Sequence, residues 1–437
     1  MSTTNVQNED LVVSLVSVCE ILPDLLSKYL EDGEKTDFVN ELDLVLSKAE
    51  CTLSQIRKAL SDIQLAKTYS FGPDEETLRS LFQALTSDRF REPTAPHNKS
   101  WFSSGETRDW QGINVVEPGS RQITSIDMGG DVLHDNLNSL PSVLCDLKHL
   151  SELDLSKSSC LLALPDEIGR LKKLRLLNCN RCIALKTLPD SIGDCTSLHT
   201  LILSDCQMLE RLPDSIGQLC RLTTLKFGAN VTSGCNALKT LPMSLGNCNQ
   251  LRELDLTKCK FLNELPESIG NLQNMTELNL RECKALGFLP SNLGSCVSLR
   301  DLGLSKCVGL QELPMTLKLL KNLLRLNISK CTGFTSGEKI MDAVFDIPSL
   351  EILNMRGCKN ISSLPEIPKT ALKKIKQWDL RGSKKLTSLP VSIEHLRNTI
   401  FLVDIRECKN LGDLQIHQGI VKLREAGCAV MTDEDHS

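Results

Sequence analysis

Apolar residues recur along most of this chain in a pattern that repeats every 24 residues, L-x-x-L-x-L-x-x-C-x-x-L-x-x-L-P-x-x-I-G-x-L-x-x. The first apolar position falls at Ile123, Leu150, Leu174, Leu198, Leu222, Leu251, Met275, Leu299, Leu323, Leu350, Ile375 and Ile400. Six of the steps between these residues are 24 residues long. A unit this short cannot bury its apolar face alone, so neighbouring units must stack into one solenoid core.

Each half of the unit predicts a different element. The L-x-x-L-x-L half predicts a short strand in which leucines point inward and polar residues point outward. Twelve such strands at ~4.8 Å spacing make a curved parallel sheet roughly 50–55 Å long, on the concave face of an α/β solenoid. The L-P-x-x-I-G-x-L half predicts a short helical or 3₁₀ turn on the outer side, with proline fixing φ at its start.

Two units in the interior of the array are longer than their neighbours and predict protrusions. One contains Gly228–Leu238 and spans 29 residues, and the other contains Gly333–Ile347 and spans 27 residues. We expect a loop or an extra helical turn in each. A further helix is predicted at Ile416–Ala426, where it would shield the last repeat.

The sequence before the repeats predicts an all-α region. Residues 1–88 place apolar side chains at helical spacing, and Gly72-Pro73 followed by three acidic residues predicts the start of a third helix. This helical head either packs on itself or serves as a dimerising or docking module. Residues 89–107, with Pro93 and Pro96, predict a linker. The solenoid of about twelve repeats, with terminal caps, is expected at 108–428, and residues 429–437 are expected to be a tail.

Charge and hydropathy exclude several classes of protein. The chain has 50 Lys and Arg against 55 Asp and Glu, so it lacks the basic excess of a nucleic-acid binder. No apolar run approaches the ~18 residues that span a bilayer. The apolar stretch Leu11–Val18 follows Glu9 and Asp10 rather than basic residues, so it does not predict an export signal. We therefore expect a cytoplasmic protein with neither a nucleic-acid nor a membrane partner.

Nineteen cysteines in such a chain are expected to be reduced thiols. The ninth position of the unit is occupied by Asp131, Ser158, Cys182, Cys206, Asn230, Cys259, Cys283, Cys307, Cys331, Cys358, Ser383 and Cys408. A small donor there can satisfy backbone carbonyls of the bend after the strand. A second set, Cys195, Cys248 and Cys296, alternates with leucine and is expected to fill the core. The Cys179-x-x-Cys182 spacing has no second pair at finger spacing, so no metal site is predicted.

No catalytic or cofactor motif is present in the sequence. The chain has no G-x-x-x-x-G-K-[ST], G-x-S-x-G, H-R-D or D-F-G segment, and its seven histidines form no H-E-x-x-H motif. We therefore expect a non-enzymatic protein with no cofactor.

The outward-facing strand positions nominate a binding surface. Nine of the twelve residues at the fifth position are Asp or Asn, and the seventh or eighth position is often basic. These charges form either a solvated ion-pair network or a polar groove for a protein partner. An arginine row over the last units could take an acidic peptide or a phosphate bidentately. The candidate binding residues are Arg281, Lys306, Lys330, Arg356, Asp379, Arg381, Asp404 and Arg406.

The repeats resemble those of the leucine-rich-repeat superfamily. The segments Leu188-Pro189-Asp-Ser-Ile192-Gly193, Leu212-Pro213-Asp-Ser-Ile216-Gly217 and Leu265-Pro266-Glu-Ser-Ile269-Gly270 look like the repeats of two plant-type groups. These are the repeat domains of disease-resistance receptors and the Ras-group-related leucine-rich-repeat proteins. The segment from Trp110 to Asp127 resembles the N-terminal cap of plant and protist arrays.

The resemblance implies a function in signalling. It suggests an intracellular scaffold or adaptor that binds a protein partner on the concave face, with a possible dimer through the N-terminal helices. The alternative is an immune-type recognition protein. Resistance receptors carry a nucleotide-binding switch, for which this sequence has no phosphate-binding loop, so that alternative requires a switch acting in trans.

Overall fold

The apolar half of each unit forms one strand of a continuous sheet in the computed structural model. It describes residues 74, 77, 80, 81, 113–115, 122–128, 138–228, 234–412 and 417–433, all of which belong to one compact unit, 73–97 and 112–437. Residues 74, 77, 80 and 81 are helical, as predicted, whereas the remainder of the expected head and the linker 89–107 lie outside the described residues. Asp74 is buried, and its carboxylate accepts a hydrogen bond from the Ile123 amide at 3.1 Å. This bond ties the helix to the first repeat.

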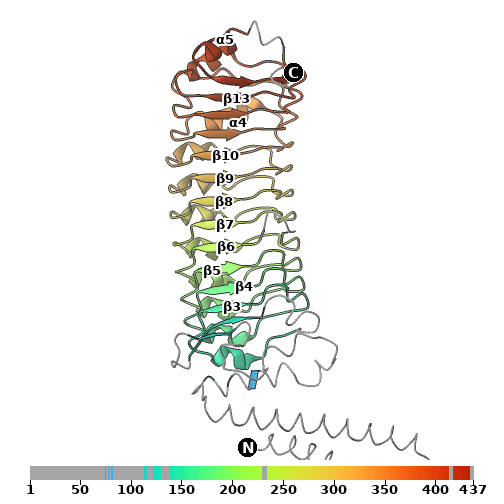
Figure 1. The fold of residues 1–437 in the computed structure, drawn as a ribbon, viewed down its shortest axis with the longest axis vertical. Coiled ribbons are helices and arrows are strands. Elements are labelled where there is room, and N and C mark those ends of the chain that lie inside the picture. Colours follow the sequence, from blue (N-terminus) through green and yellow to red (C-terminus); the bar gives the residue numbers. More distant parts are fainter. Residues whose placement is uncertain are drawn as a thin grey trace, which may run out of the picture. The chain divides into compact units, whose positions relative to one another are not determined.

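The strands follow one another in sequence order, and Figure 1 shows them stacked along the array. The first pair is antiparallel, and all later pairs are parallel with equivalent positions of adjacent units facing each other, as Leu153 faces Leu177. The predicted parallel sheet is thereby confirmed. The strands are β1 (Ile113–Val115), β2 (Ile123–Asp127), β3 (Glu152–Asp154), β4 (Leu176–Asn178), β5 (Thr200–Ile202), β6 (Thr224–Lys226), β7 (Glu253–Asp255), β8 (Glu277–Asn279), β9 (Asp301–Gly303), β10 (Arg325–Asn327), β11 (Ile352–Asn354), β12 (Gln377–Asp379), β13 (Leu402–Asp404) and β14 (Ala429–Met431).

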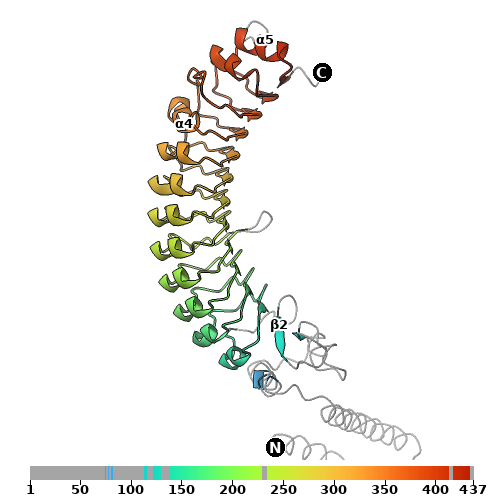
Figure 2. The same ribbon diagram turned by 90° about the vertical axis from the view of Figure 1, so that its left-hand side faces the viewer.

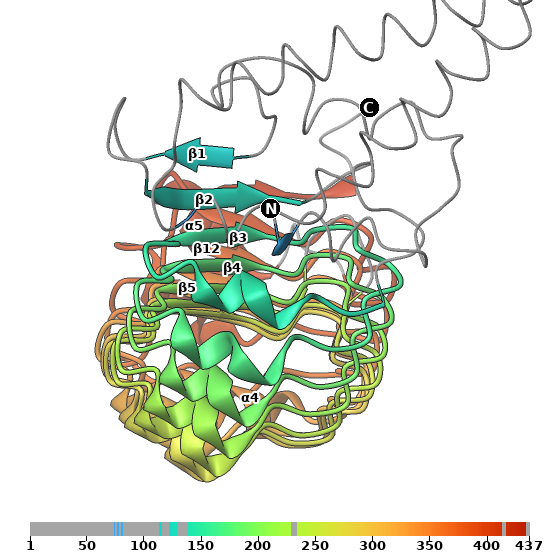
Figure 3. The same ribbon diagram turned by 90° about the horizontal axis from the view of Figure 1, so that it is seen from below.

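The L-P-x-x-I-G-x-L half of most units forms a 3₁₀ helix, also as predicted. Figure 2 shows the strands on the inner side of the curved stack and the helices on its outer side, and Figure 3 shows the units superposed along the stack. Each 3₁₀ helix follows a proline with extended backbone, such as Pro165 at φ −64°. They are η3 (Ser142–Asp146), η4 (Asp166–Arg170), η5 (Asp190–Asp194), η6 (Asp214–Gln218), η7 (Met243–Asn247), η8 (Glu267–Asn271), η9 (Ser291–Ser295), η10 (Met315–Leu319) and η11 (Val391–Leu396).

The glycine of the I-G pair allows successive 3₁₀ helices to approach each other closely. In six consecutive units, a Cβ added to this glycine would lie 2.2–2.5 Å from a backbone carbonyl oxygen of the next turn. These residues are Gly169, Gly193, Gly217, Gly246, Gly270 and Gly294. Cys145 holds the equivalent place in η3, whereas η10 and η11 have Lys318 and Glu394 there. The units with Lys318 and Glu394 are followed by an α-helix instead of a 3₁₀ helix.

The core contains two rows of buried cysteines in addition to the leucine columns. Thiols at the ninth position donate hydrogen bonds to the sixth-position carbonyl of the preceding unit, as Cys307 does to Leu280 at 3.0 Å. The expected donor role is therefore confirmed, and the acceptor lies one unit away. The second set does more than fill space, because Cys195, Cys248 and Cys296 donate to carbonyls of the preceding 3₁₀ helix at 3.1–3.3 Å. Burial raises the pKa of these three thiols to about 12, so they remain protonated donors.

One assignment in the ninth-position column is wrong. Asn230 lies outside the described residues, and Cys235 holds the slot, donating to the Leu203 carbonyl at 3.1 Å. The extra residues of this long unit therefore precede the ninth position. Cys235-x-x-Leu238 has the same spacing as Cys259-x-x-Leu262, and counting back from that leucine identifies the correct residue.

Helices replace 3₁₀ turns toward the C-terminal end of the stack. The predicted protrusion in the second long unit is α4 (Gly337–Val344), capped by the Ser336 hydroxyl, and the predicted terminal helix is α5 (Gln418–Glu425). The segment 429–437, expected as a tail, contributes β14, because Val403 pairs with Val430 and extends the sheet by one strand. Val430 is buried, so its apolar side chain accounts for the ordered strand.

Candidate functional site

The concave face is built by two side chains from each three-residue strand. In β7, Leu254 is fully buried, whereas Glu253 and Asp255 on either side of it are partly exposed. Strand alternation repeats this arrangement along the stack, with the exception of the buried Asp404 in β13, so the third and fifth positions line the face. The fifth position was predicted to do so. The third position was not singled out, because its residues, among them Thr200, Leu402 and Arg325, share no chemistry that a sequence pattern reveals.

The Asp and Asn residues at the fifth position have a structural role. In eight units the side-chain oxygen accepts a hydrogen bond from the backbone amide two residues later, at 2.7–3.2 Å. This Asx turn holds the bend that ends the strand. The eighth position then takes a positive φ, between 58° and 71°, in ten units. The bend therefore explains why Asp and Asn are frequent here, without any ligand.

The arginine row over the last three strands is only partly available to a partner. Arg406 donates to the Asp404 carboxylate, with Nε 2.9 Å from Oδ1, and Arg381 donates to Glu407, with Nε 2.9 Å from Oε1. The Arg356 side chain is exposed and forms no ion pair among the described residues. Two of the three guanidinium groups are thus already held by carboxylates of the protein.

These contacts give the two candidate carboxylates opposite pKa shifts. Burial would raise the pKa of Asp404, but hydrogen bonds from Arg406 outweigh it and lower the pKa. For Asp379, burial prevails over the hydrogen bond from the Arg381 amide, and the pKa is raised. Asp404 is therefore firmly ionised, whereas ionised Asp379 is less well stabilised.

The other candidate residues lie in earlier units along the end of the strands. Lys306 donates to Glu282 at 2.7 Å, and this bond lowers the pKa of Glu282. The Nε of Arg281 is 3.5 Å from the same carboxylate. Lys330 is exposed and unpaired among the described residues. The structure thus divides the eight candidates into a pair around Glu282 and a group over β10 to β13.

Carboxylates concentrate in the middle of the concave face. Glu253 pairs with Lys226 at 2.7 Å, and Asp301 pairs with Arg325, so Glu277 lies between two paired acids. Burial and then the neighbouring carboxylates raise the pKa of Glu277. The pKa of Asp255 is raised as well, mainly by burial. Because Lys226 and Arg325 pair with two of these acids, the centre of the face is mixed in charge and not simply acidic.

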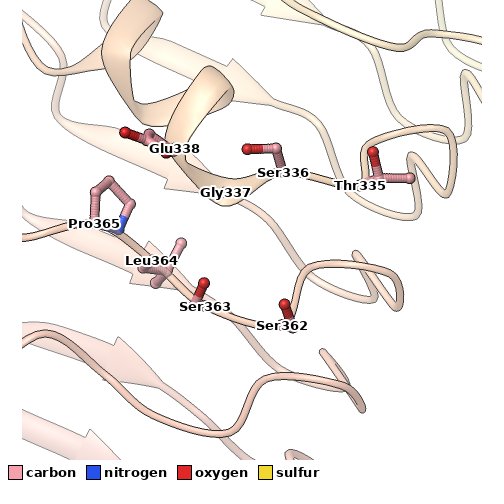
Figure 4. Close-up of a pocket in the computed structure, with 8 residues that line it drawn as sticks. All are labelled: Thr335, Ser336, Gly337, Glu338, Ser362, Ser363, Leu364 and Pro365. Atoms are coloured by element: carbon pink, nitrogen blue, oxygen red, sulfur yellow. The ribbon is translucent and has the colours of Figure 1, made fainter.

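An open pocket at the start of α4 has no catalytic set among the residues that line it. Its volume is about 390 Å³, and it is lined by Thr335–Glu338 and Ser362–Pro365 (Figure 4). Glu338 is its one ionisable residue. Across the described ranges, no group of three or more His, Cys, Asp or Glu side chains could hold a metal ion. No helix in the described part of the chain is long and apolar enough to cross a membrane.

Comparisons with known proteins point to one kind of repeat. A family model described as Leucine Rich Repeat matches residues 197–219 and 250–272. No curated protein matches the sequence. A leucine-rich-repeat protein of Leptospira interrogans is 23% identical, with a TM-score of 0.39, over 70% of this chain and 88% of that one.

Two further structures are similar. The ectodomain of the Arabidopsis thaliana receptor kinase GASSHO1/SCHENGEN3 is 20% identical, with a TM-score of 0.46, over 77% of this chain and 46% of that one. The leucine-rich-repeat domain of the type III effector XopL is 25% identical, with a TM-score of 0.40, over 57% of this chain and 73% of that one.

Proposed function

Because the chain belongs to the leucine-rich-repeat superfamily, we propose that it is a non-enzymatic scaffold that binds a protein partner on its concave face. The proposal includes a role in cytoplasmic signalling. The abundance of free thiols favours a reducing compartment, and the described cysteines are all unpaired.

The observation that carries the proposal is the sheet face itself. Parallel strands β2 to β14 present their third and fifth positions on one side, and the helices of the described repeats lie on the opposite, outer side (Figure 2). At ~4.8 Å per strand this face is roughly 60 Å long. Such a length is ample for an interface that covers ~800 Å² on each partner.

The test uses side chains that add bulk and charge to the concave face. Thr200 and Thr224 occupy the third position of adjacent strands β5 and β6. Thr200→Arg with Thr224→Arg should abolish capture of the partner from source-cell extract. The matched control is Met243→Arg with Met315→Arg, because both methionines are exposed at the start of outer 3₁₀ helices.

The outcomes separate the possibilities clearly. A protein held by the native chain and by the outer-face control, but lost by the concave variant, would support the proposal. Equal capture by all three chains would contradict it. A nucleotide-binding switch protein as the captured partner would favour the immune-type alternative over a general signalling scaffold. Far-UV circular dichroism must first show that both variants fold.

A further inference from the structure

A lysine follows each member of the arginine row three residues later. The tenth position holds Lys359, Lys384 and Lys409 in the units that start at Leu350, Ile375 and Ile400. All three are exposed, as is Lys385. The residue at the ninth position turns into the core, so the tenth position emerges at the edge of the concave face.

These lysines form one surface with two of the predicted cations. The stem of Lys330 passes over Gly357, since a Cβ on that glycine would lie 3.1 Å from Cγ of Lys330. Arg356 and Lys384 both act on the carboxylate of Glu407. We call Lys330, Arg356, Lys359, Lys384, Lys385 and Lys409 the basic rim.

The basic rim has an excess of unpaired positive charge. Within the described residues, none of its six side chains forms an ion pair or a side-chain hydrogen bond. Two of the nearby acids are already engaged, because Asp404 is held by Arg406 and Glu407 by Arg381. Arg381 and Arg406 are therefore used in ion pairs within the protein, whereas the positive charges of the rim are available to a ligand.

The pKa of Glu407 reports the effect of the nearby positive charges on a carboxylate. Its hydrogen bond with Arg381, followed by the positive charges of Arg381, Arg356 and Lys384, lowers its pKa. The main cause is Arg381, which lies outside the rim, and Arg356 and Lys384 of the rim add to the lowering, although the group is well exposed to solvent.

We propose that the basic rim binds an acidic segment of the protein partner, an inference that rests on the proposed function. A polypeptide suits the surface better than a nucleic-acid backbone. Asp379 and Glu407 lie among the cations, and they repel a ligand that carries a negative charge at every step. A peptide can place neutral or basic residues opposite these carboxylates. A flat membrane is also a poor match, because the rim borders the inner side of a curved stack.

The experiment measures binding of labelled peptides to the full chain by fluorescence anisotropy. One peptide is rich in Asp and Glu, and its counterpart has Asn and Gln at those places. The rim variant is Lys359→Gln, Lys384→Gln and Lys409→Gln. The control variant is Lys260→Gln with Lys284→Gln, which alters the tenth position in two earlier units. We expect the acidic peptide alone to bind, the rim variant to lose about tenfold in affinity, and the control to lose none. Raised salt should weaken the binding.

Three results would overturn the inference. Equal binding of the acidic peptide to all chains would remove the rim as its site. A second result is that the acidic peptide fails to bind, while RNA or phosphatidylserine vesicles bind to the native chain and not to the rim variant. That result would assign the rim to a nucleic acid or a membrane instead of a peptide. Failure of every probe would leave the rim without a ligand. In each case, loss of a partner through Thr200→Arg with Thr224→Arg would still support the proposed function, so the two ideas fail separately.

Discussion

Replacing Gly270 by alanine should destabilise the protein, although alanine is normally the better helix former. The added Cβ would lie 2.4 Å from the carbonyl oxygen of Asn292 and 2.8 Å from the Asn292 Cβ. Real Cβ atoms stay at least 3.0 Å from such neighbours, so η8 and η9 would have to separate. The ladder between β8 and β9 on the opposite side of the units resists that separation.

The magnitude follows from two opposed effects. Overpacking of a fitted contact costs about 1–3 kcal/mol. The better helix propensity of alanine and the lower entropy of its unfolded chain together offset at most about 1 kcal/mol. We therefore expect a net loss of about 1–2 kcal/mol, read as a lower urea midpoint by far-UV circular dichroism with little change in slope.

Gly287 provides the matched control. A Cβ there meets no atom within 4 Å, and its φ is not positive. Gly287→Ala should therefore leave the midpoint unchanged or raise it slightly. If Gly270→Ala and Gly287→Ala shift the midpoint alike, the close approach of the 3₁₀ helices does not limit this stack, and the reasoning fails.

Three other predictions concern single side chains. Leu254→Ala empties a fully buried site in β7 and should cost about 2–5 kcal/mol in urea unfolding; a loss below about 1 kcal/mol would mean that the units collapse around the gap. Cys220 is the exposed thiol of the described part of the chain, so Cys220→Ser should remove a fast phase of reaction with Ellman's reagent, whereas Cys296→Ser should not. Asp255→Asn should stabilise the protein at neutral pH, because burial raises the pKa of Asp255 and an amide can keep the hydrogen bond to the Thr257 amide, as Asn279 does with its own bend. The folded state binds the proton of Asp255 more tightly than the unfolded state. The stability gained by Asp255→Asn should therefore shrink as the pH falls through the raised pKa towards the ordinary value of 3.8. A gain that grows in acid would contradict this reasoning.

The sequence determines the register of the sheet because the apolar residues at the first, fourth and sixth positions of each unit must all point inward. Leu153, Leu177 and their equivalents pair in the predicted order for this reason. The count failed at Asn230, where extra residues enter a unit before its ninth position. An insertion shifts every position counted from the start of a unit, but it leaves the spacing of Cys235 to Leu238 unchanged.

The candidate site was harder to predict, because its charges interact across units. Glu407 lies 26 residues after Arg381, and only the stacking shows that the two form an ion pair. The excess of Asp and Asn at the fifth position suggested selection for binding, although a local Asx turn accounts for it. A periodic column indicates that a position is constrained, but the pattern alone does not separate a bend from a ligand site.

The glycine row determines which repeats can be exchanged for one another. A unit that carries this glycine, such as the one that starts at Leu251 or Met275, fits below any neighbour with a 3₁₀ turn, so it can be duplicated or deleted with both junctions intact. The glycine row ends at the unit that starts at Leu299, where Lys318 holds this position and α4 follows instead of a 3₁₀ turn. We therefore expect insertion or deletion of whole repeats to be tolerated best in the stretch that carries the glycine row, before α4.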